Sequence, residues 1–251
     1  HFVVDIAEQH GAYNLTRAGH IKNSLVVRGL KAKGVESVLI DTTKTIGEAL
    51  NTNLPEQHEK SGPVILEVTK AIKLFNESKE LQQKIFLDVQ QGRTINIGPI
   101  VDATKQTIDA IFKNPDAFIC VINIRNKNEY LFEHSVSVSV LITVFAHFLK
   151  MDKQIILQLA IGAFLHDVGK IKMPSQILNK VGKLTALEFR VMQRHVNHSI
   201  EIIKATPGIS TLSLEVAALH HERLDGSGYP LKLAQEHISN YGAMIANVLF
   251  R

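Results

Sequence analysis

Two pairs of adjacent metal-ligand residue types stand 54 positions apart in the sequence. His166 and Asp167 form the first pair, with Lys170 three residues later, and His220 and His221 form the second. Imidazole and carboxylate together suit Mn, Fe, Co, Ni or Zn. No cysteine accompanies them, which argues against a closed structural zinc site. With further histidines at His134 and His195, the pattern predicts a catalytic metal centre.

The residue types also indicate which reaction such a centre could perform. Two ions about 3.5–4 Å apart can activate water and clamp both oxygens of a phosphoryl displacement, lowering the pKa of water from ~15.7 toward ~7. A lysine beside the centre adds positive charge near the phosphate. Neighbouring residues on a regular helix diverge by ~100°. His220 and His221 can therefore both be ligands only with two metals or at a helix end.

The two clusters resemble the two signatures of the HD-GYP phosphodiesterases, a bacterial branch of the HD metallohydrolases. The first is His166–Ile171 and the second is His220–Pro230. The resemblance extends over about residues 125–246 and includes Glu133-His134-Ser135, Ile177–Lys180 and Gly182–Thr185. It implies an all-helical domain that hydrolyses cyclic di-GMP to the linear dinucleotide, to GMP, or to both.

The same resemblance implies a role for individual residues. Asp167 would bridge two divalent ions, Fe or Mn, and Lys170 would neutralise charge developing on the phosphate. The implied metal ligands are His134, His166, Asp167, His195, His220 and His221. The implied substrate-binding residues are Lys170, Arg223, Gly228, Tyr229 and Pro230. We expect six further histidines to be structural or exposed: His10, His20, His58, His147, His198 and His237.

Two positions depart from the family pattern. Some members bind a third metal through a glutamate four residues before the first histidine ligand, where this chain has Tyr130, with Glu129 one place earlier. A two-metal centre is therefore predicted. The family also has an aspartate ligand after the second signature, and counting places it at Leu249. No aspartate follows Asp225. Either the ligand is missing or a segment is absent from the sequence. We expect the latter, because the chain begins at His1 without a methionine.

Composition restricts the setting of the protein. The 251 residues are 45% hydrophobic, enough for one or two domains with a core. The single cysteine, Cys120, excludes an intrachain disulfide and favours a reducing cytosol. Net charge is +4, without a dense basic run, so no binding of DNA is predicted. The richest apolar run, Ile155–Leu165, is interrupted by Gln158 and too short for a membrane span. We therefore expect a cytoplasmic protein.

The first 60 residues predict a small α+β accessory domain. Phe2–Ile6 and Ser37–Asp41 have the β-branched composition of strands, and His20–Lys33 has helical spacing ending at Gly34. The order of these elements resembles a poorly characterised domain that often precedes HD-GYP domains. The polar segment Glu56–Ser61 predicts a linker.

Residues 61–124 predict linker helices. The apolar spacing in residues 64–91 is compatible with a signalling or dimerising helix and with an ordinary amphipathic helix packed on its own chain, and the short repeat favours the latter. Gly92–Pro99 interrupts this helix and Asp102–Asn114 forms the next. Phe118–Ile124 resembles a strand in composition, but the family resemblance implies a helix.

Residues 125–251 predict the catalytic domain, with only helices from Asn126 onward. The alternation of valine and serine around Val138 would suggest a strand, but the resemblance implies a helix. Further helices are expected at Ile155–His166, from a capping box at Thr185 and Glu188 through Lys204, and at Ser213–His221. Gly226 and Gly228 would permit positive φ in the loop that follows.

Three functions are compatible with these observations. The first is a dinuclear-metal phosphodiesterase for cyclic di-GMP, with the N-terminal domain regulating it or binding signalling partners, and with a homodimer considered. The second is a degenerate receptor that binds the nucleotide without turnover, which a missing carboxylate ligand would favour. The third is hydrolysis of mixed cyclic GMP-AMP, because no residue pattern identifies the base.

Overall fold

The structure is a computed structural model that describes residues 2–9, 19–20, 35–41, 61–123 and 130–249. It divides into two compact units, residues 1–57 and 58–251. The predicted linker Glu56–Ser61 lies outside the described residues except for Ser61, which begins a helix. His10 and His58 also lie outside them.

The described part of the N-terminal unit is a three-stranded antiparallel sheet. Its strands are β1 (Phe2–Gln9), β2 (Gly19–His20) and β3 (Val35–Asp41), in the order β2-β1-β3. β1 pairs with β3 from Phe2 opposite Asp41 to Gln9 opposite Val35, with register shifts between. Both predicted strands are confirmed. The predicted helix lies outside the described residues, except that its first residue, His20, belongs to β2.

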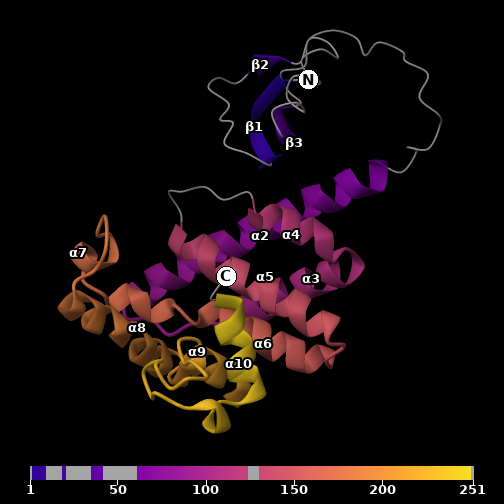
Figure 1. Cartoon of the computed structure of the whole chain (residues 1–251). Coiled ribbons are helices and arrows are strands. Elements are labelled where there is room, and N and C mark those ends of the chain that lie inside the picture. The colour runs from indigo at the N-terminus through magenta and orange to yellow at the C-terminus, as the bar shows by residue number, and fades with distance from the viewer. Residues whose placement is uncertain (1, 10–18, 21–34, 42–60, 124–129, 250–251) are drawn as a thin grey trace, which may run out of the picture. The chain divides into compact units, whose positions relative to one another are not determined.

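The described part of the second unit is mainly helical (Figure 1), as the family resemblance implied. An isolated β-bridge pairs Asp225 with Ala234. The α-helices are α2 (Ser61–Gln90), α3 (Ile97–Lys113), α4 (Pro115–Asn123), α5 (Tyr130–Phe148), α6 (Lys153–Leu165), α7 (Ser175–Leu178), α8 (Ala186–Lys204), α9 (Thr211–Leu219) and α10 (Asn240–Leu249), and the 3-10 helices are η2 (Val168–Lys172) and η3 (Gln235–His237).

At two segments the composition predicts a strand and the family resemblance implies a helix, and the structure has a helix at both. α4 contains the described part of the segment whose composition suggests a strand, as far as Asn123, and α5 contains the valines that alternate with serines. In α5 both residue types are buried, including Ser135, Val136 and Ser137. A helix surrounded on most sides buries residues all around its axis, so the alternation carries no strand information there.

Side-chain caps fix where several helices begin. Asp152 accepts a hydrogen bond from the Gln154 N–H at 2.7 Å, which starts α6. Thr185 and Glu188 form the predicted capping box at the start of α8, each side chain accepting the other's backbone N–H. Such caps satisfy donors that have no partner inside the helix. They fix the start of the helices that carry His166 and His195.

The core of the unit forms around α5 and α6, which pack against each other (Figure 1). α2 packs on α3, α4 and α5, and α9 packs on α6, α8 and α10. α2 buries one stripe within its own unit: Ala71, Leu74, Phe75, Ser78, Gln82, Ile85 and Phe86. The structure therefore supports the interpretation of α2 as an amphipathic helix packed on its own chain.

Two helical windows are longer and more apolar than the sequence analysis allowed. Leu131–Phe148 and Lys153–Lys172 meet the length and hydropathy of a membrane span, so the expectation that no run is long enough was wrong by that measure. More than half of each window, 56% and 67%, is buried inside the fold. Packing in the core accounts for their apolar composition.

Candidate metal centre

The fold brings six predicted ligands together from four separate segments. His134 lies on α5, His166 and Asp167 follow the last turn of α6, His195 lies on α8, and two further histidines follow α9. Their ligand atoms form two groups, each within 4.8 Å. One group is His134, His166 and Asp167, and the other is His195, His220 and His221.

Asp167 stands between the two groups and presents one oxygen to each. Its Oδ2 lies 3.2 Å from His166 Nε2 and 3.9 Å from His134 Nε2. Its Oδ1 lies 3.2 Å from His195 Nε2 and 3.9 Å from His220 Nε2. This is the arrangement in which one carboxylate can serve two ions.

Three of the histidines are oriented by their own helices. The Nδ1 of His166 lies 2.6 Å from Ala163 O, and those of His195 and His220 lie 2.7 Å from the carbonyl oxygens of Met192 and Ala217. A carbonyl can only accept, so each Nδ1 carries the proton, and this assignment leaves each Nε2 with a free lone pair. Metal-binding histidines are commonly held in this way.

The lone pairs and the carboxylate fit a divalent ion. Within the described residues, His166 Nε2 and Asp167 Oδ1 are buried without a hydrogen-bond partner. His195 Nε2 and His220 Nε2 face each other at 3.2 Å. Two ligands bound at ~2.0–2.1 Å to one ion lie about 3.0–3.4 Å apart. The donor set is therefore already spaced and oriented for metal coordination.

The protonation states of the cluster agree with this. Burial raises the pKa of Asp167, but the neighbouring side chains of His166, Lys170 and His195 outweigh it and hold the pKa well below its usual range. Burial, with His221 nearby, holds the pKa of His220 well below its usual range. Burial and His195 likewise lower the pKa of His221 to about 3. An ionised carboxylate and neutral imidazoles are the forms that bind metal.

The adjacent histidines His220 and His221 contact the same group because the helix ends there. α9 stops at Leu219, and His220 is its C-terminal cap. Both histidines belong to the group of His195, with ring centroids 4.2 Å apart. Of the two arrangements that the sequence left open, the structure shows the helix end.

Lys170 lies on η2 and reaches back to the cluster. Its Nζ donates to Asp167 Oδ2 at 2.6 Å, and its side chain is 18% exposed. It thus holds one of the two carboxylate oxygens while keeping access to solvent. This location fits the predicted contact with a substrate phosphate and differs from a freely solvated lysine.

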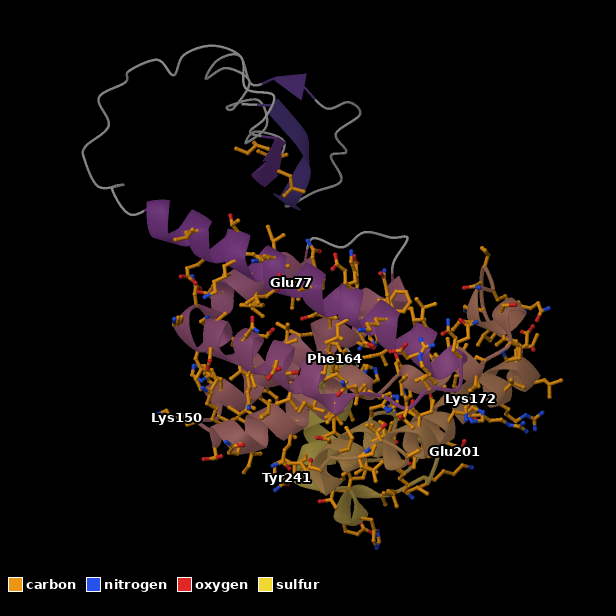
Figure 2. The ribbon with its side chains drawn as sticks, turned by 180° about the vertical axis from the view of Figure 1, so that it is seen from behind. Glu77, Lys150, Phe164, Lys172, Glu201 and Tyr241 are labelled. Carbon is orange, nitrogen blue, oxygen red and sulfur yellow. The ribbon has the colours of Figure 1, made fainter. Side chains whose placement is uncertain are left out.

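Gly169 allows η2 to lie directly against α8, a contact that the sequence analysis did not identify. Its backbone N–H donates to Ser199 Oγ at 2.8 Å. A Cβ atom at this position would lie 2.1 Å from His195 O and 2.4 Å from Ser199 N. Only glycine permits this approach, which places Asp167 beside His195. On the outer side, exposed Lys172 of η2 pairs with Glu201 of α8 at 3.3 Å (Figure 2).

The loop after His221 is held by Glu222, which the sequence analysis also did not single out. This fully buried carboxylate accepts the backbone N–H of Leu231 at 2.6 Å and that of Leu233 at 2.9 Å. Gly228 packs on the same segment, where a Cβ would lie 2.4 Å from Arg223 N. The predicted positive φ is found at Gly226 (73°) and was wrong for Gly228, which is needed for close approach.

Tyr229 covers the second group of ligands. Its ring stacks on His221 at 4.5 Å between centroids, and its backbone N–H donates to His221 O at 3.1 Å. The ring of Phe189, a partly exposed residue of α8, lies edge to face with the Tyr229 ring, with centroids 6.0 Å apart. Burial, together with the charge of Asp167, raises the pKa of the Tyr229 hydroxyl, so it stays protonated at neutral pH.

The other predicted positions are not members of the two ligand groups. Arg223 is partly exposed and its Nε lies 3.5 Å from Asp225 Oδ1, while Pro230 follows Tyr229 in the same loop. His198 pairs with Glu201 at 3.3 Å, and His147 stacks on Phe112 at 4.0 Å. Leu249, where the family places an aspartate, packs against the core cluster around α6 and α10. His237 is exposed beside Glu236.

Comparison with known families agrees with this site. A family model described as "HD domain" matches residues 120–248, and one described as "Domain of unknown function (DUF3391)" matches residues 2–100. The first covers half of the chain, so the chain belongs to the HD-domain family. It carries both HD-GYP signatures at the ligand cluster. The DUF3391 match covers the N-terminal unit, all of α2 and the start of α3, and so supports the predicted accessory domain.

Individual relatives extend the similarity beyond the HD domain. The chain is 30% identical over 241 residues to Cyclic di-GMP phosphodiesterase PA4108 of Pseudomonas aeruginosa, covering 89% of this chain and 57% of that protein. It is 28% identical over 233 residues to Cyclic di-GMP phosphodiesterase of Thermotoga maritima, covering 88% and 62%. The chain thus spans about three fifths of the length of these relatives.

A solved structure shares the fold. Bd1817, an HDG"Y"P protein from Bdellovibrio bacteriovorus, superposes with a TM-score of 0.62 at 19% identity, covering 77% of this chain and 61% of that one. At this identity the likeness concerns the fold.

Proposed function

We propose that this protein is a metal-dependent phosphodiesterase that hydrolyses cyclic di-GMP to the linear dinucleotide, to GMP, or to both. The observation that carries the proposal is a cluster of five histidines around Asp167, whose carboxylate directs one oxygen to each of two ligand groups. Relatives named cyclic di-GMP phosphodiesterases over most of this chain support the substrate.

The two groups would hold two divalent ions, Fe or Mn. His134, His166 and Asp167 would hold one ion, and His195, His220 and His221 the other, with Asp167 shared. Ions of this kind supply Lewis acidity that activates water and neutralises phosphate charge. The protein's part is to fix the ligands: the carbonyls of Ala163, Met192 and Ala217 orient three imidazoles before any ion binds.

Lys170 would act on the substrate phosphate. In the structure its ammonium neutralises Asp167, and bound cations would take over that task. The ammonium, which is partly exposed, would then be available to a non-bridging oxygen of the scissile phosphate. Its charge is most effective as negative charge builds up on phosphorus, because the buried surroundings screen it less than water would.

A second substrate has specific support. The chain is 45% identical over 83 residues, 33% of its length, to 3'3'-cGAMP-specific phosphodiesterase 2 of Vibrio cholerae, which is covered to 16%. We therefore keep mixed cyclic GMP-AMP as the alternative substrate. The exposed side chains of Phe189 and Arg223 could stack on a base and bind a phosphate, and neither kind of contact selects adenine or guanine.

A second function, a receptor without turnover, also has an observation in its favour. Leu249, where counting along the sequence places the family's aspartate ligand, is a partly buried apolar residue that packs against the core. If six ligands hold the ions too weakly, the protein would bind nucleotide and signal through its N-terminal unit. Protein partners, a homodimer and a cytoplasmic location remain predictions.

The test is turnover of the metal-loaded protein. Protein loaded anaerobically with Fe(II) or Mn(II) is incubated separately with cyclic di-GMP and 3'3'-cGAMP, and products are separated by chromatography. We expect linear dinucleotide or GMP and close to two ions per chain. The Asp167→Ala variant should form no product and should bind less metal. His198→Gln is the matched control, because it removes a histidine one turn beyond His195 that pairs with Glu201 instead.

Each negative outcome has a distinct meaning. Two ions with nucleotide binding and no product would support the receptor. No ions with an intact helical spectrum would refute the proposed metal centre. Product from 3'3'-cGAMP alone would replace the substrate and leave the chemistry in place.

A further inference from the structure

One face of α2 contacts the residues beside two of the proposed metal ligands. Lys79, Gln82 and Phe86 are spaced i, i+3 and i+7 and so lie along one side of the helix. Their partners are Glu133, Phe164 and Phe132. Glu133 precedes His134 directly, and Phe164 precedes His166 by two residues.

Gln82 makes the contact to the end of α6. Its side-chain Nε2 donates to the backbone carbonyl of Phe164, and the whole side chain is buried. Phe164 lies beside α2 in the interior of the helical unit (Figure 2). The carbonyls in the last turn of a helix lack partners within that helix. Here Ala163 O accepts from the His166 ring and Phe164 O accepts from Gln82. The turn that orients His166 is therefore also fixed from α2.

Lys79 and Phe86 make the contacts to the start of α5. Lys79 Nζ lies 3.8 Å from Glu133 Oε1, with both side chains mostly buried. The Phe86 ring meets the Phe132 ring edge to face, with centroids 5.1 Å apart. These two contacts therefore fix the first turn of α5, which leads directly into His134.

All three contacts concern one ligand group. His134, His166 and Asp167 follow the segments that α2 touches, and α2 also packs on η2. The other group comes from α8 and the end of α9, which pack on each other. α8 also packs on η2, and α9 also packs on α6 and α10. α2 is thus placed to alter one group more than the other.

We propose that α2 is the positioning element for the group of His134, His166 and Asp167, acting through Lys79, Gln82 and Phe86. The inference rests on the proposed two-ion function. It assigns a role to the connection between the units as well, because the chain passes from the N-terminal unit into the ligand-bearing helices by way of α2. A shift of α2 would weaken the ion of this group first.

The test is stepwise metal binding by Gln82→Met, measured by calorimetric titration of the metal-free full chain with Mn²⁺. Methionine keeps the volume and removes the hydrogen bond to Phe164 O. Loss of a group that orients ligands costs about 10–100-fold in metal affinity. We expect about 10-fold here, because Gln82 acts through the backbone. Only one of two binding steps should weaken, and His134→Ala identifies that step by abolishing it.

Ile85→Val is the matched control. It removes one methyl group from the same buried stripe of α2. It should lower stability without changing either binding step. Equal effects of Gln82→Met and Ile85→Val on both steps would overturn the inference, because α2 would then contribute packing alone. A wild-type chain that binds no Mn²⁺ would refute the proposed function instead.

A second variant covers the case in which Gln82→Met does not fold. Glu133→Gln removes the charge that faces Lys79 and keeps its shape. It should weaken the same step as Gln82→Met, by a smaller factor because the pair is 3.8 Å apart and partly exposed. Weakening of the other step, or of neither, would refute a role for α2 in positioning this group.

Discussion

Replacement of Gly169 by alanine is expected to separate the segments that hold Asp167 and His195. The new Cβ would lie 2.1 Å from His195 O, 2.4 Å from Ser199 N and 2.8 Å from Ser199 Oγ. The two nearest of these are backbone atoms of α8, which cannot rotate away as a side chain can. Because a Cβ essentially never lies within 3.0 Å of a neighbour, η2 and α8 would have to separate by about 1 Å.

That displacement acts on both stability and metal binding. Overpacking of this kind costs roughly 1–3 kcal/mol, or roughly 2–12 °C in Tm for a unit of this size. Asp167 Oδ1 lies 3.2 Å from His195 Nε2, and opening this distance by about 1 Å takes it beyond the ~3.0–3.4 Å spacing of adjacent ligands on one ion. We therefore expect at least one ion per chain to be lost.

The assay is thermal unfolding followed by circular dichroism, with elemental analysis of the purified variant. Gly98→Ala is the control, since a Cβ there meets only Asn96 Oδ1 at 3.4 Å, an ordinary contact, in the first turn of α3. It should change stability by less than about 0.5 kcal/mol. Wild-type Tm and wild-type metal content in Gly169→Ala would refute the argument that close approach of η2 to α8 builds the site.

Three further predictions concern other groups. Lys170→Ala should keep its metal but lose ~10²–10³ in turnover, because its charge acts in the transition state; unchanged single-turnover rates would make it a surface lysine or a ground-state anchor. Glu222→Gln should lower the free energy of unfolding in urea by about 1–3 kcal/mol, because the amide keeps one acceptor oxygen and leaves the second loop N–H facing an NH₂ group; an unaltered midpoint would contradict this. Hydrogen bonds from Lys180 and Thr185 lower the pKa of Glu188 from 4.5 to about 2. Its stabilisation is therefore complete above pH 4.5 and is lost toward pH 2, so the difference in unfolding free energy between wild type and Glu188→Gln should shrink with acid, and a constant difference would refute it.

The candidate ligands and most helices could be predicted from the sequence because both have local patterns. His166-Asp167 and His220-His221 are adjacent pairs, and the capping box at Thr185 marks the start of α8 within four residues. Where local pattern and environment disagree, as around Val138, composition alone gave a strand. Family resemblance corrected it, since full burial removes the polar face on which the pattern depends.

The supports of the ligands could not be predicted in the same way. Gln82 and Phe164 O are 82 residues apart, and Gly169 and Ser199 are 30 apart. Nothing near Gln82 in sequence distinguishes it from Gln83. Such pairs form only when segments distant in sequence come together. The carboxylate of Glu222 likewise has partners nine and eleven residues further on, which no local pattern indicates. The positive φ expected at Gly228 was wrong for a related reason, because its need for glycine comes from a neighbouring backbone.

The origin of the six candidate ligands in four segments, from His134 to His221, would have a consequence for the lifetime of the protein. An ion bound by such a set joins parts of the chain that are distant in sequence, so its binding free energy adds to the free energy of unfolding. At a free ion concentration of 100 times Kd, one site contributes about 2.7 kcal/mol. Resistance to proteolysis should then follow the supply of metal, and chains made during metal shortage would be degraded sooner than loaded ones.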